Sequence, residues 1–357
     1  MHRPDMTANP DDTPAPGQAL RQRIAATGTT SELAAIAREF RALQCQMTWL
    51  GYGADMQGRT VTGLVDALTS RLIELAEAQM TPAPGPYAWL ACGSQGRQEQ
   101  TVHTDQDNAL IYADGLPGEA DAWFQRLGEF VTDGLAACGV SHCPGGVSPR
   151  LPHWRRSRTS WRQLFRNTID QPERKAVMLA SHYFDLRVVH GEPALFEPLR
   201  REALEAASRN SRFLSLATDN ALRNAPALGL FGRLRRVWSG AHAGSINLKH
   251  HGLMPITQLA LNHALQGPLH PLNTLERIHA AADCGLLPAS SARDLALAYN
   301  TIADLRHRHL ARQLEEGLEL DNFLPLQTAC WLERRQLKDA LAVIGTAQKA
   351  LKLGQAA

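Results

Sequence analysis

The residues best suited to chemistry lie in one short segment, from Gly93 to Asp107. A Gly-Ser pair closes an apolar run there, and two aspartates, Asp105 and Asp107, follow with one residue between them. Gly93 lacks a Cβ, so a phosphate can approach its backbone closely, and Ser94 adds a hydroxyl donor. Two neighbouring carboxylates suit Mg²⁺, which prefers oxygen ligands and substrate phosphates. The segment therefore predicts a site that holds a triphosphate beside a divalent metal.

Gly96 and Arg97 extend the same interpretation. Gly96 keeps the bend after the Gly-Ser pair open, and Arg97 offers a guanidinium fork that matches phosphate oxygens. A helix or turn that starts at this corner has free N–H groups that favour an anion. Taken singly, a Gly-Ser pair is usually a turn and an Asp-x-Asp is usually a solvated loop. It is their order and spacing together that favour nucleotide chemistry.

A third carboxylate is expected from a later strand, because such sites commonly hold two metal ions, about 3.5–4 Å apart. The candidate is Asp185, in the alternating, β-prone run from Tyr183 to Gly191. We expect Asp185 to complete the metal shell or to take the proton of an attacking hydroxyl. A simple salt bridge with Arg187, on the same strand face, is the alternative.

These side chains need rigid elements to hold them. The apolar run from Pro86 to Cys92 is typical of a buried strand, and a second strand is predicted through Ala109–Tyr112. If Asp105 and Asp107 belong to the second strand, they share one face, roughly 7 Å apart. Helical spacing of apolar residues predicts helices near 33–43, 61–79, 119–137, 158–169 and 173–181. This alternation predicts an α+β fold, with a small mixed β-sheet and flanking helices.

The second half of the chain has a different pattern. No strand signal follows residue 194, and helices are predicted at 194–207, 211–223, 256–266, 272–284, 289–314 and 321–351. We expect a disordered tail at 1–16, a site-bearing domain with N-terminal helices at 17–192, and an all-helical domain at 193–357. The site would lie in the cleft between the two domains, where ligand pockets commonly form.

Composition is that of an ordinary soluble protein, since 44% of the 357 residues are hydrophobic and 20% are charged. The net charge of +2 is too small to argue for bulk nucleic-acid binding. No apolar leader and no long apolar run is apparent, so neither secretion nor a membrane span is expected. Six cysteines without a CxxC pair fit a reducing cytoplasm. Cys138, His142 and Cys143 lack a fourth ligand for zinc.

Positive charge is nearly all arginine, and Lys249 is one of only five lysines. Lys249 either reaches a phosphate from the second domain or lies on the surface at a helix edge. The arginines at 155–166 and 233–236 would meet a triphosphate or an acidic protein substrate, although solvated helix faces explain such clusters more often. His307 and His309 are expected on an exposed helix face rather than at a metal.

The motifs, taken as a set, resemble the putative nucleotidyltransferases of bacterial signal-transduction proteins, which are often fused to CBS or cyclic-nucleotide-binding domains. The resemblance runs from about residue 40 to about residue 345. It is strongest in Gly93–Glu99, Thr104–Ile111 and Phe184–Arg187, with further matches at Gly252–Ile256 and Asp304–Arg306. The Gly-Ser and Asp-x-Asp elements are also similar to those of the catalytic domain of protein-PII uridylyltransferase. All of these belong to the DNA polymerase beta-like nucleotidyltransferase superfamily.

The resemblance implies that Gly93 and Ser94 bind nucleotide phosphates, that Asp105 and Asp107 hold the metals, and that Asp185 is the third carboxylate. Asn247 departs from the family, which usually has Asp at this position. That departure weakens any charged role at 247.

We therefore expect a cytoplasmic, Mg²⁺-dependent enzyme of the uridylyl- or adenylyltransferase type. It would move an NMP group from an NTP to a hydroxyl of a regulatory protein or a small molecule, using two Mg²⁺ ions, with Mn²⁺ as a substitute. The expected catalytic and metal-binding residues are Asp105, Asp107 and Asp185. The expected nucleotide-binding residues are Gly93, Ser94, Gly96, Arg97 and Lys249. The alternative is a non-catalytic, nucleotide-responsive signalling module.

Overall fold

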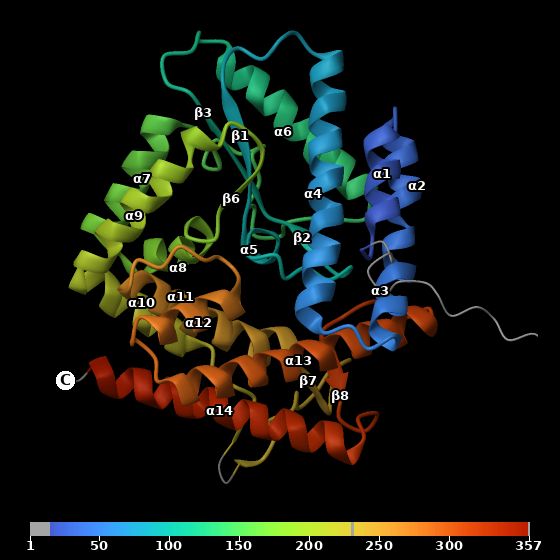
Figure 1. Cartoon of the computed structure of the whole chain (residues 1–357), viewed down its shortest axis with the longest axis vertical. Helices are drawn as coiled ribbons and strands as arrows, with labels where there is room; N and C mark the ends of the chain where they lie inside the picture. The colour runs from blue at the N-terminus through green and yellow to red at the C-terminus, as the bar shows by residue number, and fades with distance from the viewer. Residues whose placement is uncertain (1–14, 230–231, 356–357) are drawn as a thin grey trace, which may run out of the picture.

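The computed structural model describes residues 15–229 and 232–355, so the tail predicted at 1–16 lies almost wholly outside the described residues. A sheet flanked by helices forms the upper half in Figure 1, and stacked helices form the lower half. Within the described residues, no helix combines the length and the apolar character that crossing a membrane requires. The architecture is the α+β fold that the sequence predicts.

A four-stranded mixed sheet with the order β5-β3-β1-β6 forms the centre of the upper half. The central strand β1 is antiparallel to β3 and β6, whereas β3 is parallel to β5. A separate pair of short parallel strands joins β2 to β4. The strands of this half are β1 (Tyr87–Ala91), β2 (Asp105–Gln106), β3 (Asn108–Tyr112), β4 (Ser141–His142), β5 (Arg155–Ser157) and β6 (Arg187–Gly191).

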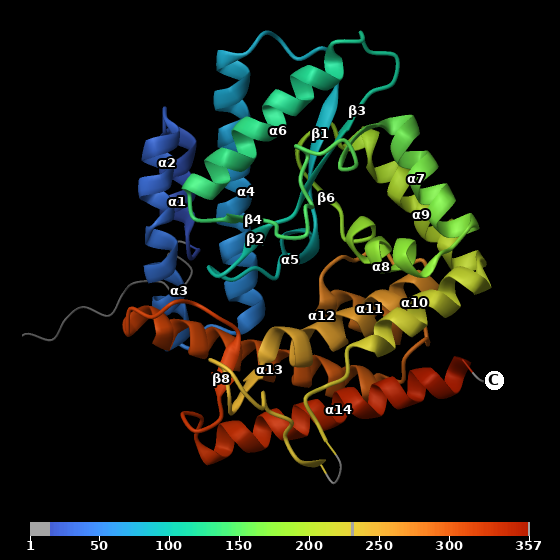
Figure 2. The same cartoon turned by 180° about the vertical axis from the view of Figure 1, so that it is seen from behind.

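Helices cover both faces of this sheet, which explains why all five residues of β1 are buried. Tyr87 and Trp89 of β1 pack against α4 and α6, and Figure 2 shows these two helices from behind. Ala88 and Leu90, which point to the opposite face, pack against α7, α8 and α9. The helices of this half are α1 (Gln18–Ala26), α2 (Thr30–Ala37), α3 (Glu39–Trp49), α4 (Ala54–Gln79), α5 (Gly93–Gly96), α6 (Ala120–Ala137), α7 (Arg158–Asp170), α8 (Arg174–Tyr183) and α9 (Glu197–Arg209), with a 3₁₀ turn at Pro193–Leu195.

The lower half is built from five helices and a short antiparallel strand pair within the described residues. Its core gathers Ile246, Ile256, Ile302 and Leu341 from different elements. The elements are α10 (Ser211–Arg223), β7 (Ser245–Asn247), a π-helical turn (Lys249–Leu253), α11 (Met254–Gln266), α12 (Thr274–Asp283), α13 (Ala289–Glu315), β8 (Phe323–Pro325) and α14 (Trp331–Gln355).

Four expectations about elements were wrong. The second half contains the strands β7 and β8, and the helix predicted at 321–351 begins only at Trp331. Asp105 and Asp107 do not share one strand, because β2 ends at Gln106 and β3 begins at Asn108. Asp107 lies between the two strands, where its carbonyl accepts a hydrogen bond from Cys92 N at 2.8 Å. Asp185 lies in the turn after α8, ahead of β6.

Candidate active site

Two glycines let three chain segments meet at the end of β1. Gly93 has a φ of +56°, and a Cβ at this position would lie 2.8 Å from Oδ2 of Asp107. A Cβ on Gly96 would lie only 2.0 Å from the backbone oxygen of Asp185. Because neither approach leaves room for a methyl group, the corner at 93–96 holds Asp107 and Asp185 close to the end of β1.

Asp105 and Asp107 form the acidic part of this site, together with Cys143 from the loop after β4. One ligand atom from each of the three residues lies within 4.8 Å of the other two. Burial, followed by the charge of Asp105, raises the pKa of Asp107, while a hydrogen bond with Cys143 opposes the rise. Burial and the contact with Asp107 raise the pKa of the Cys143 thiol to about 11. A neutral thiol beside two carboxylates leaves the carboxylate oxygens as the ligands for a hard cation.

Asp185 is almost fully buried and lies between two arginines. One carboxylate oxygen accepts a hydrogen bond from Arg97, and the other accepts one from Arg277 of α12 at 2.7 Å. Burial opposes ionisation, but the charges of Arg277 and Arg97 outweigh it and hold the pKa of Asp185 below its usual value. Asp185 is therefore a buried, charged carboxylate with both oxygens paired.

The same arginine links the corner to the lower half of the molecule. Arg97 also donates to Glu99 at 2.8 Å, and Glu99 accepts a hydrogen bond from the backbone N–H of Thr274 at 2.6 Å. The side chain of Asn273 donates to the backbone oxygen of Arg97 at 3.1 Å. A continuous polar network therefore runs from the Gly-Ser corner to the start of α12.

A pocket of about 590 Å³ opens above this network, between the sheet and the lower helices. The upper half contributes Gly93, Ser94, Arg97, Asp105, Asp107, Cys143 and Asp185. The lower half contributes mainly polar and basic side chains: Asn220, Arg223, Lys249, His250, Gln258 and Arg306. Of the residues expected at the site, only Gly96 is not part of the pocket wall, because it is buried beneath it.

Lys249 is half-buried in the π-helical turn, and its positive charge partly offsets the burial that raises the pKa of Asp107. Such turns within helices often occur at functional sites. Asn247 positions the turn, since its side-chain oxygen accepts a hydrogen bond from the backbone N–H of His250 at 2.8 Å. An uncharged residue at 247 thus has a structural role.

Other expectations about single residues were wrong, and some residues of the site were missed. His307 and His309 are buried rather than exposed. Arg187 pairs with Asp66 of α4 at 2.8 Å and not with Asp185. Within the two arginine groups, Arg155 is buried and pairs with Asp121. Arg277 was missed, because it carries no motif signal of its own and only the fold brings it to Asp185. Cys143 and Arg306 belong to segments that resemble the family, but no role at the site was expected of them.

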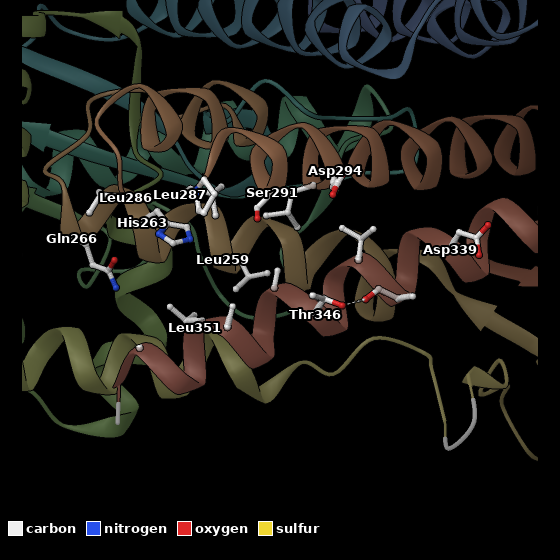
Figure 3. Close-up of a pocket in the computed structure, with 17 residues that line it drawn as sticks. Leu259, His263, Gln266, Leu286, Leu287, Ser291, Asp294, Asp339, Thr346 and Leu351 are labelled. Carbon is white, nitrogen blue, oxygen red and sulfur yellow. Dashed lines mark hydrogen bonds between the residues drawn. The ribbon is translucent and has the colours of Figure 1, made fainter. Parts of the chain in front are cut away.

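A second cavity of about 600 Å³ lies among α11, α13 and α14 (Figure 3). Its walls are mostly apolar, as the labelled side chains of Leu259, Leu287 and Leu351 illustrate. Its carboxylates, Asp294 and Asp339, belong to no described group of three metal-ligating side chains. The chemistry predicted from the sequence therefore belongs to the pocket at Gly93.

Comparison with protein families gives two matches along the chain. The model described as "Putative nucleotidyltransferase DUF294" matches residues 38–175, which include the Gly-Ser corner, both aspartates and Cys143. The model described as "Putative nucleotidyltransferase substrate binding domain" matches residues 211–354, which form the lower helices. Among curated proteins, no significant match was found.

Proposed function

The chain belongs to the family of putative nucleotidyltransferases, and we propose that it moves an NMP group from an NTP to an acceptor hydroxyl in a metal-dependent reaction. The observation that carries the proposal is the pocket itself. It brings a glycine corner, two adjacent carboxylates and a basic helical wall together from segments far apart in the sequence. This combination suits a polyanionic nucleotide that arrives with a cation.

The donor set fits magnesium. Asp105 and Asp107 supply oxygen ligands, and Mg²⁺ commonly combines one or two carboxylates with substrate phosphates. The bound cation would neutralise charge on the triphosphate and orient it for in-line attack. The raised pKa of Asp107 supports a cation here, because an adjacent positive charge would relieve the repulsion between the two carboxylates. A second ion would need a further carboxylate, for which Asp185 is the candidate.

In this reaction the protein would position the triphosphate and neutralise its negative charge. Gly93 and Ser94 would hold the β- and γ-phosphates, with Lys249 and Arg97 facing the charge. A bond forms between the acceptor oxygen and the α-phosphorus, the bond from the α-phosphorus to the bridging oxygen breaks, and pyrophosphate leaves. The hydroxyl proton passes to a carboxylate of the pocket. To accept this proton or to bind a metal ion, Asp185 must first release its hydrogen bond with Arg97 or with Arg277.

The second candidate function is a non-catalytic, nucleotide-responsive signalling module. The state of Asp185 favours it, since both carboxylate oxygens are already paired with arginines. Such a module would bind nucleotide at the same corner and report it through the network to α12. It would not transfer the NMP group.

The test compares the wild type with the double variant Asp105→Asn/Asp107→Asn. Each NTP is titrated calorimetrically with and without Mg²⁺, and each α-labelled NTP is then incubated with a random copolymer of glutamate and tyrosine as the hydroxyl acceptor. We expect Mg²⁺-dependent binding and label transfer by the wild type, and a loss of about 100-fold or more in the double variant. The preferred NTP distinguishes an adenylyltransferase from a uridylyltransferase.

Asp294→Asn is the matched control, because it removes a carboxylate from the other cavity. It should bind and transfer like the wild type. Nucleotide binding that ignores Mg²⁺, together with no label on any acceptor, would instead identify the non-catalytic module.

A further inference from the structure

A basic groove of about 960 Å³ lies between α8, α10 and α14, next to the pocket of Asp105 and Asp107. Five cationic side chains line it: Arg174, Lys175, Arg223, Lys349 and Lys352. Asp219 is the one acidic residue among the described residues of its wall. We call this surface the basic groove.

The five cations are exposed, and none of them forms an ion pair with another described residue. Elsewhere in the upper half, arginines on helix surfaces do find partners, as Arg162 and Arg166 do in Glu202. Five positive charges facing a single carboxylate in a concave surface create a positive potential that attracts an anionic partner.

Lysine usage singles out the same surface. Of the 37 basic residues, only five are lysines. Three of these line the basic groove, and Lys249 lines the catalytic pocket. Only Lys338 lies outside both. A compact, hydrated ammonium group suits single carboxylates better than it suits a planar, bidentate partner.

The helix α14 presents two different faces. Gly345, Gln348, Lys349 and Lys352 follow the i, i+3, i+4, i+7 spacing of one helix face and line the basic groove. Thr346 and Leu351 belong to the face that lines the apolar cavity of Figure 3. The lysines are therefore concentrated on one side of α14.

The basic groove is continuous with the catalytic pocket. Met178, Asn220 and Arg223 line both, so the groove lies directly beside the pocket of Asp105 and Asp107. We propose that the basic groove docks an acidic protein segment that carries the acceptor hydroxyl into the catalytic pocket. This inference rests on the proposed transfer to a hydroxyl.

The wall of the groove favours protein over nucleic acid. Its remaining side chains include the apolar Met178, Leu216 and Leu222, which match aliphatic side chains of a peptide. No aromatic residue is among its described lining residues, whereas proteins that bind single strands usually stack bases on aromatic rings. The whole chain carries a net charge of only +2, so the positive charge is local.

The experiment measures docking without nucleotide. A fluorescein-labelled random copolymer of glutamate and tyrosine is titrated with the full chain by fluorescence anisotropy at low and high salt. We expect wild-type binding that weakens with salt, and a loss of about tenfold or more in Lys349→Glu/Lys352→Glu. Lys338→Glu is the matched control, because it reverses a lysine on the same helix outside the groove, and it should bind like the wild type.

Three results would overturn the proposal: copolymer binding that survives Lys349→Glu/Lys352→Glu, an equal loss in Lys338→Glu, and tighter binding of a labelled oligothymidylate of matched charge. The last result would make nucleic acid the occupant. Circular dichroism checks that each variant is folded. Because docking is measured without NTP, its result does not depend on label transfer. The copolymer can fail to bind while another acceptor is labelled, and it can bind while no acceptor is labelled. The proposed function and the docking proposal are thus judged separately.

Discussion

At the scale of single residues, the charge of the buried Asp185 carboxylate is stabilised by two guanidinium groups, those of Arg97 and Arg277. Replacing Arg277 tests how much this pairing contributes to the stability of the fold. Arg277 is itself fully buried, and it also donates to the backbone oxygens of Pro271 and Phe184. Replacing Arg277 with Gln leaves one oxygen of a buried carboxylate without its charged partner. We expect the free energy of unfolding to fall by about 3–5 kcal/mol, as measured by urea denaturation.

A double-mutant cycle checks that the loss comes from this pair. Asp185→Asn/Arg277→Gln should be less destabilised than the sum of the two single variants, because the pair is then removed together. Additive losses would show that Arg277 acts through its backbone contacts alone.

Gly93 and Gly96 should respond differently to alanine. In Gly93→Ala the new Cβ meets only the flexible carboxylate of Asp107, so we expect a loss of about 1–2 kcal/mol in stability and about tenfold in Mg²⁺–NTP affinity. In Gly96→Ala the Cβ meets the backbone of Asp185, which cannot move alone, so we expect a loss of stability above about 3 kcal/mol. Urea denaturation and calorimetry measure both effects. Equal stability of the two variants would contradict the close approach at Gly96.

The sequence predicted part of the site because that part is local. Gly93, Ser94, Asp105 and Asp107 belong to one segment, and their spacing carries the chemistry. Arg277 lies 92 residues from Asp185, and no sequence motif links the two positions, so their ion pair could not be predicted. The partners of a buried carboxylate are fixed by packing, which single-sequence patterns do not encode.

At the scale of elements, α13 carries an unusual buried residue in His307. Burial, followed by the charge of Arg306, lowers the pKa of His307 to about 3. Its Nδ1 has no hydrogen-bond partner among the described residues. The folded protein therefore keeps His307 neutral in a pH range where the unfolded chain protonates it.

Acid should therefore destabilise the fold through His307. The folded pKa lies below the unfolded value, so the contribution of His307 is retained above about pH 6.5 and lost as the pH falls towards 3. In this window we expect stability to fall by about 1.4 kcal/mol per pH unit more in the wild type than in His307→Gln. Urea midpoints at pH 7.0 and 5.5 measure the difference. Identical pH slopes would show that His307 does not titrate on unfolding.

Elements with a long amphipathic pattern were predictable, and the shortest ones were not. The helix predicted at 119–137 is α6, and the one predicted at 211–223 is α10. β7 and β8 have three residues each, which is too short for an alternating pattern to stand out. Asp105 and Asp107 were placed on one strand because the sequence does not show that β2 pairs with β4 and ends at Gln106.

At the scale of the whole molecule, the two halves share a core. Leu261 and Leu265 of α11 pack with Phe184 and Phe213 in the cluster beneath the sheet. The polar network at Asp185 and the ion pair between Arg59 and Glu276, 2.8 Å long, also cross between the halves. The boundary predicted at 192/193 therefore separates segments of the chain that pack closely together.

Residues 15–192 expressed alone should be destabilised. This fragment lacks Arg277, α9, α10 and α11, so it exposes part of one face of the sheet and of the shared core, and it leaves Asp185 with a single partner. We expect increased binding of a hydrophobic dye and a lower, broader thermal transition than in the full chain, measured by fluorescence and circular dichroism. Adding residues 193–355 in trans should restore the sharp transition. A fragment as cooperative as the intact chain would show that the shared packing contributes little.

In the pocket, Asp185 and a bound nucleotide would compete for the guanidinium group of Arg97. The guanidinium of Arg97 already neutralises Asp185, so a triphosphate that binds Arg97 would have to replace the carboxylate of Asp185 as its partner. Once the nucleotide has bound Arg97, the carboxylate of Asp185 would have one unpaired oxygen, which could bind a divalent cation. Nucleotide and cation would then each increase the affinity for the other, and in the empty protein the occupied guanidinium would weaken the attraction for stray phosphates.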